Sequence, residues 1–320
     1  MYHKNPPSLL TMLKSAGRFF YIRMEEYSKE YSTPHQLIEI LKSRGLKINN
    51  SDEQTLRSIG YYRLSAYLHP YLATPKSKHQ FKPDSTFTKS IQLYNFDRKL
   101  RLLVFDQIER IEIAVRSAIV NITCQQTCNP FWMTDPSYYA RSDKFQRTMS
   151  LIDKELQTSR EDFIEHFIHT YSNSYPPAWM LSEIIPFGVL TRVYENIASN
   201  QIRKKIAQYF GLSVPVMASW LTIITLTRNS CCHHSRLWNK TLSLKALLMN
   251  RWSYPWISDS VQQGRIFFTL CIIKHFLDIV YPQNTLKEDI HKLLEEFPII
   301  DIEAMGFPQK WEKEALWENK

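Results

Sequence analysis

The residues of this chain best suited to chemistry lie together in one short stretch, residues 228–239. It holds Arg228, Asn229, His233 and His234, directly after an apolar run that must be buried. Arginine is a permanent cation whose planar fork suits phosphate, and histidine both accepts and donates a proton near neutral pH. Within a turn or two of each other, they can stabilise charge and transfer protons on a phosphodiester. The same residue types also occur at ordinary helix ends, where they complement the helix dipole.

Two other kinds of site share this stretch. Cys231 and Cys232 stand beside two histidines, and Cys124 with Cys128 could supply a second pair of zinc ligands. Because neighbouring ligands do not easily wrap one tetrahedral ion, we expect cysteines that act as small apolar residues, with no metal and no cofactor. Cys232 beside His233 would also make a nucleophile, but no third orienting group is identifiable. The chain has no glycine-rich phosphate loop, so nucleotide hydrolysis has no support.

The motif is placed by a helix that we expect to begin near Ser213, with that serine as N-cap and Pro215 in the first turn. Upstream, residues 34–72 predict two helices separated by Gly45. This pair could read DNA as a helix-turn-helix, and its tyrosines and arginines fit either base stacking or core packing. Further helices are predicted over residues 140–170, 187–198, 201–210, 242–249, 261–280 and 285–294, and the Trp- and Pro-containing tail is expected at the surface.

A long helix is predicted over residues 87–123, because apolar residues recur there at helical spacing without glycine or proline. Its polar face also carries Arg98 and Arg101. Glu109, Glu112 and Arg116 follow at steps of three and four, so they share a face. They either pair with one another along a solvated face or project into a groove beside the motif arginine.

Length and composition limit the class of protein. With 320 residues, 44% of them hydrophobic, and only 7 glycines against 16 prolines, the chain predicts a mainly α-helical globular fold. The net charge of +9 favours a polyanionic partner, either nucleic acid or an anionic membrane surface. Five cysteines, an odd number, suit a reducing cytoplasm. Because no signal peptide or membrane-spanning run is evident, we expect a cytoplasmic protein that does not enter a membrane.

The motif and two upstream blocks carry a resemblance. An arginine, a polar residue and a histidine four to six positions after the arginine form the signature of HEPN-type ribonucleases, which Arg228 and Asn229 with His233 or His234 fit. The longer stretch through Asn239 resembles the Abi-like proteins of the AbiD/AbiF group, bacterial abortive-infection factors. Residues 59–67, and residues 94–101 running on to 111–116, match the same group in the same order. Ala66, where many relatives would have glycine, touches no proposed chemistry.

The resemblance implies an all-α helical bundle of the HEPN type with a small N-terminal helical region. We expect residues 1–33 to form a peripheral arm or helix, residues 34–85 a helical region with a basic linker, and residues 86–320 the HEPN-like domain. It also implies an anti-phage endoribonuclease that cleaves RNA without a metal. Because such ribonucleases place two motifs face to face and this chain has one, we expect a homodimer, which a regulatory RNA or an antitoxin could hold silent.

The roles of the site residues follow from their chemistry. We assign proton transfer to His233, stabilisation of the phosphorane to Arg228, and orientation of a side chain or the phosphate to Asn229. His234 is the second candidate for proton transfer, and we expect one of the two histidines to face the groove and the other to point inward. Supporting or RNA-binding roles are expected for Arg236, Asn239, Arg98, Arg101, Glu109, Glu112 and Arg116. The competing functions are a non-catalytic RNA-binding module or toxin-antitoxin-like component and, more weakly, a transcription regulator.

Overall fold

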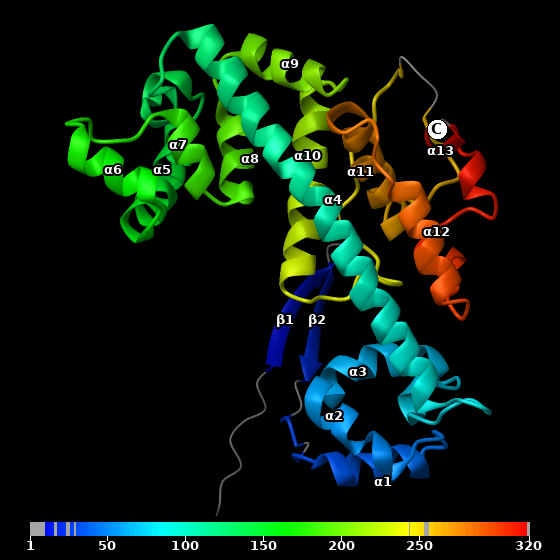
Figure 1. Cartoon of the computed structure of the whole chain (residues 1–320). Helices are drawn as coiled ribbons and strands as arrows, with labels where there is room; N and C mark the ends of the chain where they lie inside the picture. Colours follow the sequence, from blue (N-terminus) through cyan, green and yellow to red (C-terminus); the bar gives the residue numbers. More distant parts are fainter. Residues whose placement is uncertain are drawn as a thin grey trace, which may run out of the picture. The chain divides into compact units, whose positions relative to one another are not determined.

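The structure is a computed structural model that describes residues 10–15, 18–23, 26–28, 30–242, 244–252 and 256–318, with the side chains of residues 10–23 outside that description. The chain divides into two compact units, Met1–Ser90 and Ile91–Lys320, so the boundary falls in the first turn of helix α4 (Figure 1). The described part of the chain holds thirteen α-helices and one pair of short strands. The predicted all-α fold is therefore confirmed.

The first unit contains three short helices and the strand pair. Strands β1 and β2 run antiparallel, pairing Leu10 with Arg23 and Ser15 with Arg18, so this part of the expected N-terminal arm is not helical. The helix predicted after Gly45 is split in two at Gly60, whose φ of 86° is readily adopted only by glycine. The elements are β1 (Leu10–Ser15), β2 (Arg18–Arg23), α1 (Pro34–Ser43), α2 (Glu53–Ile59) and α3 (Tyr61–Leu68), with 3-10 turns at Asn50–Asp52, His69–Tyr71 and Lys76–Lys78.

Helix α4, Phe87–Thr127, is the longest element of the chain. It extends four residues beyond the predicted end at residue 123. Its buried side chains recur at helical spacing along its length: Leu93, Phe96, Leu100, Val104, Ile108, Ile111, Val115 and Ile119. The uninterrupted apolar periodicity therefore did predict a single helix.

The second unit consists of α4 and the helices that follow it. The charged helix predicted over residues 140–170 is two helices, because Ser159 adopts an extended conformation and its hydroxyl accepts the Glu161 N–H at 3.3 Å. The remaining helices are α5 (Ser142–Thr158), α6 (Asp162–Thr170), α7 (Ala178–Ile184), α8 (Phe187–Asn196), α9 (Asn200–Tyr209), α10 (Val214–Cys232), α11 (Ile266–Val280), α12 (Leu286–Glu296) and α13 (Ala315–Glu318), with 3-10 turns at Trp132–Thr134, Pro136–Tyr138, Glu303–Met305 and Trp311–Lys313.

Helices α8, α10 and α11 form the centre of the second unit. Helix α10 packs against α8, α9 and α11, and nearly every side chain of α11 is buried. The imidazole of His275 in α11 is bonded to the Phe210 carbonyl at 2.8 Å and lies edge-on to Trp220 of α10. Burial lowers the pKa of His275 to about 4, so this histidine is neutral in the core at physiological pH. Helix α10 is thus packed against three other helices before it reaches the motif.

Two sequence predictions after the motif were wrong. Residues 242–249 form no helix where they are described, because α10 side chains bind their backbone: Trp220 Nε1 donates to the Leu247 carbonyl at 2.8 Å, and Ser219 Oγ accepts the Leu247 N–H at 2.9 Å. The C-terminal tail is not a surface feature either. Trp311 and Trp317 are buried, and Trp317 stacks on Phe267 of α11 with 5.8 Å between ring centroids.

Candidate active site

Helix α10 ends at the motif in a tight turn. Two backbone bonds close it, from the His234 N–H to the Cys231 carbonyl at 3.0 Å and from the Ser235 N–H to the Ser230 carbonyl at 2.8 Å. This bonding pattern normally places glycine at the first residue after the cap, where φ is positive. Here that residue is His234, with φ of 55°. A non-glycine residue in this conformation is strained, and such strain often lies at functional sites.

The arginine of the motif is held by a carboxylate of α4. Arg228 Nε lies 3.5 Å from Glu112 Oε2, and Arg116 Nη2 donates to Glu112 Oε1 at 3.0 Å. Arg116 is fixed in turn by a 3.1 Å bond from Nη1 to the Ile185 carbonyl. The longer Arg228–Glu112 separation is an ion pair without a hydrogen bond, which leaves the Nε–H of Arg228 unsatisfied. Each of the two sequence interpretations therefore holds in part: Glu112 pairs with Arg116 along the helix face, and it also reaches the motif arginine.

This guanidinium–carboxylate cluster carries net positive charge. Two arginines share the one carboxylate of Glu112, and Arg228 is the most exposed of the three, with 31% of its side chain accessible against 15% for Glu112 and 10% for Arg116. The excess charge therefore reaches solvent at Arg228. The Nη1 atom of Arg228 also lies 3.5 Å from Asn229 Oδ1, at the limit of a hydrogen bond.

Both histidines of the motif are exposed. His233 caps α10, with its N–H bonded to the Asn229 carbonyl at 2.9 Å, and His234 occupies the strained position after it. The expectation that one of them points inward was wrong, because the turn carries both to the surface. Both imidazoles are therefore accessible to solvent.

A buried aspartate anchors the chain just after the histidines, and the sequence analysis did not single it out. Asp97 of α4 is fully buried; its Oδ1 accepts the N–H groups of Leu237 at 3.0 Å and Trp238 at 2.6 Å. Its Oδ2 accepts from Arg101 Nη1 at 2.5 Å. The signal that could have found it is the Asp–Arg pair four residues apart on the apolar face of a helix. The prediction that Arg101 lies on the polar face of the helix was wrong, because its pairing with Asp97 holds it in the core, where it supports the motif segment.

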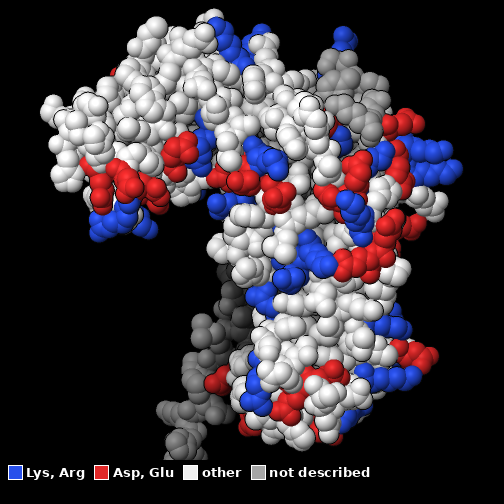
Figure 2. All heavy atoms as spheres, in the orientation of Figure 1, with Lys and Arg blue, Asp and Glu red and all other residues white. Residues whose placement is uncertain are grey.

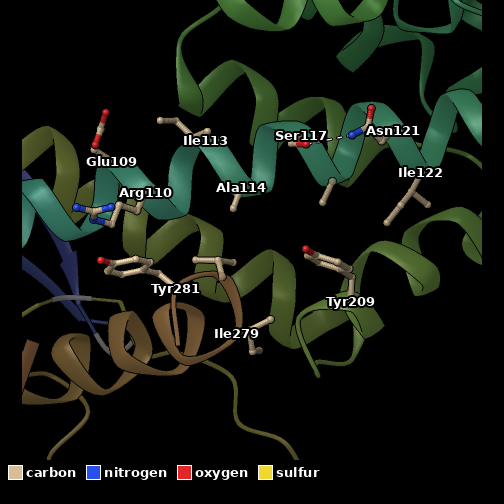
Figure 3. Close-up of a pocket in the computed structure, with 12 residues that line it drawn as sticks. Glu109, Arg110, Ile113, Ala114, Ser117, Asn121, Ile122, Tyr209, Ile279 and Tyr281 are labelled. Atoms are coloured by element: carbon tan, nitrogen blue, oxygen red, sulfur yellow. Dashed lines mark hydrogen bonds between the residues drawn. The ribbon is translucent and has the colours of Figure 1, made fainter. Parts of the chain in front are cut away.

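The other predicted site residues are dispersed. Asn239 accepts from Arg265 Nη1 at 2.9 Å, Arg98 is exposed and Arg236 is half-buried. Glu109 lies outside the Arg228 cluster and lines a groove of about 580 Å³ between α4, α9 and α11, next to Arg110, whose guanidinium carbon is 4.5 Å from the ring centroid of Tyr281 (Figure 3). The groove is lined by Glu109, Arg110, Ile113, Ala114, Ser117, Ala118, Asn121, Ile122, Tyr209, Ile279, Val280 and Tyr281.

The adjacent cysteines of the motif have different environments. Burial raises the pKa of Cys231 to about 12, so its thiol is a poor nucleophile, whereas Cys232 is exposed. Across the described residues, no three His, Cys, Asp or Glu side chains are grouped so that they could hold a metal ion. On the face shown in Figure 2, Lys and Arg side chains are interspersed with Asp and Glu side chains.

The fold and the site define an all-helical protein with an arginine–histidine motif at the end of a buried helix. Residues 54–239 match the Abi-like protein family, and this match spans more than half of the chain. The chain therefore belongs to the Abi-like proteins, which supports a function in bacterial abortive infection. No curated protein and no solved structure matches the chain.

A helix that crosses a bilayer needs about 20 consecutive, mostly apolar residues. In the described part of the chain, no single helix combines the length and the apolar character needed to cross a bilayer, and α9 with α10 meets them only as a pair bent by 63°.

Proposed function

We propose that this chain is a metal-independent endoribonuclease of the HEPN type that acts in abortive infection. The observation that carries the proposal is the Arg228 guanidinium, held by Glu112 at the end of a helix where two exposed histidines follow. When the 2′-hydroxyl of an RNA attacks its own adjacent phosphate, the reaction needs only a base, an acid and cationic charge on the phosphorane. These residue types supply all three. DNA lacks the hydroxyl and is expected to be inert.

Arg228 stabilises the phosphorane in this mechanism. Its position is restrained before substrate binds by the ion pair with Glu112, a carboxylate that is itself bonded to Arg116 and through it to the Ile185 carbonyl. A preorganised cation is worth more than a flexible one, since no reorganisation is needed when the charge develops. The single carboxylate neutralises only one of the two guanidinium groups. The remaining charge is available to the phosphate.

His233 transfers the proton, with His234 as the second candidate. Histidine can act as base or acid near neutral pH, and such proton transfer is worth roughly 10²- to 10⁴-fold in rate. Asn229 Oδ1 lies 3.5 Å from Arg228 Nη1, which supports a role for Asn229 in orienting either that side chain or the phosphate. Arg236 and the exposed Arg98 are the remaining cations that could contact the RNA backbone.

The active unit is proposed to be a homodimer, because one Arg228/His233 set offers too few groups for both the acid and the base. Exposed apolar side chains flank the motif on both helices. Phe105 begins a row on α4 that continues through Glu109 to Glu112 and Arg116 at steps of four, three and four, and Leu226 lies one turn before Asn229 on α10. A second copy that covers these side chains would bring the two motifs together. A regulatory RNA or an antitoxin that covers the same surface would keep the enzyme silent.

The first experiment is incubation of the purified protein with mixed RNA in EDTA, followed by analysis of the product ends. We expect products with cyclic phosphate and 5′-hydroxyl ends, and no cleavage of DNA of the same sequence. Loss of activity on chelation that a divalent ion restores would refute the mechanism. Tight RNA binding without any product would favour the alternative, a non-catalytic RNA clamp or toxin-antitoxin-like component that uses the same arginine.

A second experiment tests the shared site by mixing Arg228→Ala chains with His233→Ala chains. Each variant alone is expected to be inactive. If the two motifs form one site, the mixed dimer keeps one arginine and one histidine and recovers part of the activity. Two independent sites would recover none. RNA cleavage by a protein that stays monomeric at high concentration would rule out the composite site.

A further inference from the structure

The first unit contains a pocket that the proposed cleavage site does not use. It has a volume of about 410 Å³, within the range of small-ligand sites, and it lies between the end of α1, helix α3 and the loop that follows α3. Its walls include Arg44, Tyr61, Leu68, His69, Lys76 and Phe81. None of the described residues that line it is acidic. The surrounding residues 34–90 hold nine lysines and arginines against four acidic residues.

Backbone bonds hold the pocket open without a ligand. The loop returns along itself through bonds from the Ala73 N–H to the Gln80 carbonyl and from the Lys82 N–H to the Tyr71 carbonyl, both 2.8 Å. The Phe81 N–H donates to the Arg44 carbonyl at 2.8 Å and ties the loop to the end of α1. Binding of a ligand therefore carries no entropic cost for ordering this loop.

The lining combines two chemistries. Leu68 is buried and forms an apolar floor, beside the half-buried rings of Tyr61 and Phe81. Cationic groups stand around it: Arg44 at the end of α1 and Lys76 in the loop, whose Nζ lies 3.3 Å from Nδ1 of His69. An aromatic and apolar surface suits the face of a base, and the cations suit phosphate. An acidic peptide would use only the second of these features.

We propose that this pocket binds one nucleotide of single-stranded RNA, with the base against Tyr61 and a phosphate at Lys76 and Arg44. The choice of RNA as ligand rests on the proposed function, but binding here requires no cleavage. The pocket is a second point of attachment for the substrate, on a unit that lacks the motif. It selects unpaired RNA, because a base inside a duplex is not available to enter it.

The test measures binding of a fluorescein-labelled, 12-nucleotide single-stranded RNA to the full chain by fluorescence anisotropy, with His233→Ala present in every protein to prevent cleavage. Lys76→Ala is expected to weaken binding about 5-fold and to lower the slope of log affinity against log salt by about 1, as loss of a phosphate contact does. Lys78→Ala is the matched control, because it removes the same charge from the same loop outside the pocket. Equal effects of the two substitutions would overturn the proposal.

A second pair of variants tests the base. Tyr61→Ala is expected to weaken binding about 10-fold, whereas Tyr61→Phe keeps the ring and should bind within about 2-fold of the parent. Competition with adenosine monophosphate and with inorganic phosphate separates a nucleotide site from a phosphate site, and displacement by phosphate alone at the same concentration would contradict the proposal. Wild-type protein that cleaves RNA, with Lys76→Ala and Tyr61→Ala binding normally, refutes the pocket alone. Pocket-dependent binding without cleavage refutes only the proposed enzyme.

Discussion

The two ends of the motif differ in exposure: its first residues present polar side chains to solvent, and its last residues are buried. Residues 228–234 place a guanidinium and two imidazoles at the surface, whereas Leu237 and Trp238 are buried and bonded through their backbone to Asp97. Both ends belong to one sequence signature. One sequence motif can therefore contain both exposed polar side chains and the buried groups that anchor them, and residue type alone does not separate the two.

The largest expected effect is on the buried end. Asp97→Ala removes the partner of Arg101 and leaves that guanidinium unpaired in the core, which should lower the free energy of unfolding by about 3–5 kcal/mol. Urea unfolding measures it. Asp97→Ala combined with Arg101→Met removes both charges and should recover a large part of the loss. If the single substitution costs less than about 1 kcal/mol, Asp97 does not anchor the motif.

At the exposed end, a substitution should change the rate of RNA cleavage much more than the free energy of unfolding. Arg228→Ala is expected to lower the rate of RNA cleavage about 100-fold, equivalent to about 2.7 kcal/mol of transition-state stabilisation, with little change in urea stability. Glu112 keeps its bond to Arg116, so no carboxylate is left unpaired. Arg147→Ala, at an exposed arginine of α5, serves as the control for general loss of charge. Similar losses of activity in both variants would contradict a specific role for Arg228.

The strained histidine lies between these two ends and allows a matched comparison. His234→Gly and His234→Ala both remove the imidazole, but only glycine relieves the positive φ, so the glycine variant should be more stable by about 1 kcal/mol. Thermal unfolding compares the two. If the imidazole transfers a proton, both variants lose activity equally. Activity that follows stability instead would show that the backbone, and not the side chain, is what matters at this position.

The smallest expected effect is a difference in alkylation rate between the neighbouring residues Cys231 and Cys232. Because the thiolate is the reactive form and burial raises the pKa of Cys231 to about 12, iodoacetamide at pH 8 should modify the exposed Cys232 and spare Cys231 in the native protein. Thiolate forms only as the pH approaches the pKa, so protection of Cys231 should weaken at strongly alkaline pH. Peptide mapping by mass spectrometry gives both rates. Equal rates at pH 8 would show that the turn opens readily.

Much of the fold was predictable because the sequence signals were local. The apolar periodicity of α4 runs without glycine or proline, and α10 begins directly after Ser213, as predicted. The errors lie where distant contacts decide the structure. Residues 242–249 have an apolar helical pattern, but the side chains of Trp220 and Ser219 bind their backbone. The tryptophans of the C-terminal tail show no helical spacing, and Trp317 is buried because it stacks on Phe267 of α11.

The candidate site was predictable in its residue types and only partly in its geometry. Glu112 and Arg228 are 116 residues apart, and spacing along α4 placed Glu109 and Glu112 on one face without showing that only Glu112 meets Arg228. Asp97 escaped notice because an acidic residue on a helix is usually solvated. Its role depends on two backbone N–H groups that no sequence pattern marks.

The bond between Asp97 and Leu237 also limits when the motif can be anchored during synthesis of the chain. The two residues are 140 positions apart, so at about 5–20 residues per second the ribosome needs roughly 7–28 s to add the second after the first. During that interval α4 can form, but the motif and its anchor cannot meet. The motif segment therefore meets its anchor only after Leu237 has been added, about three-quarters of the way along the 320 residues.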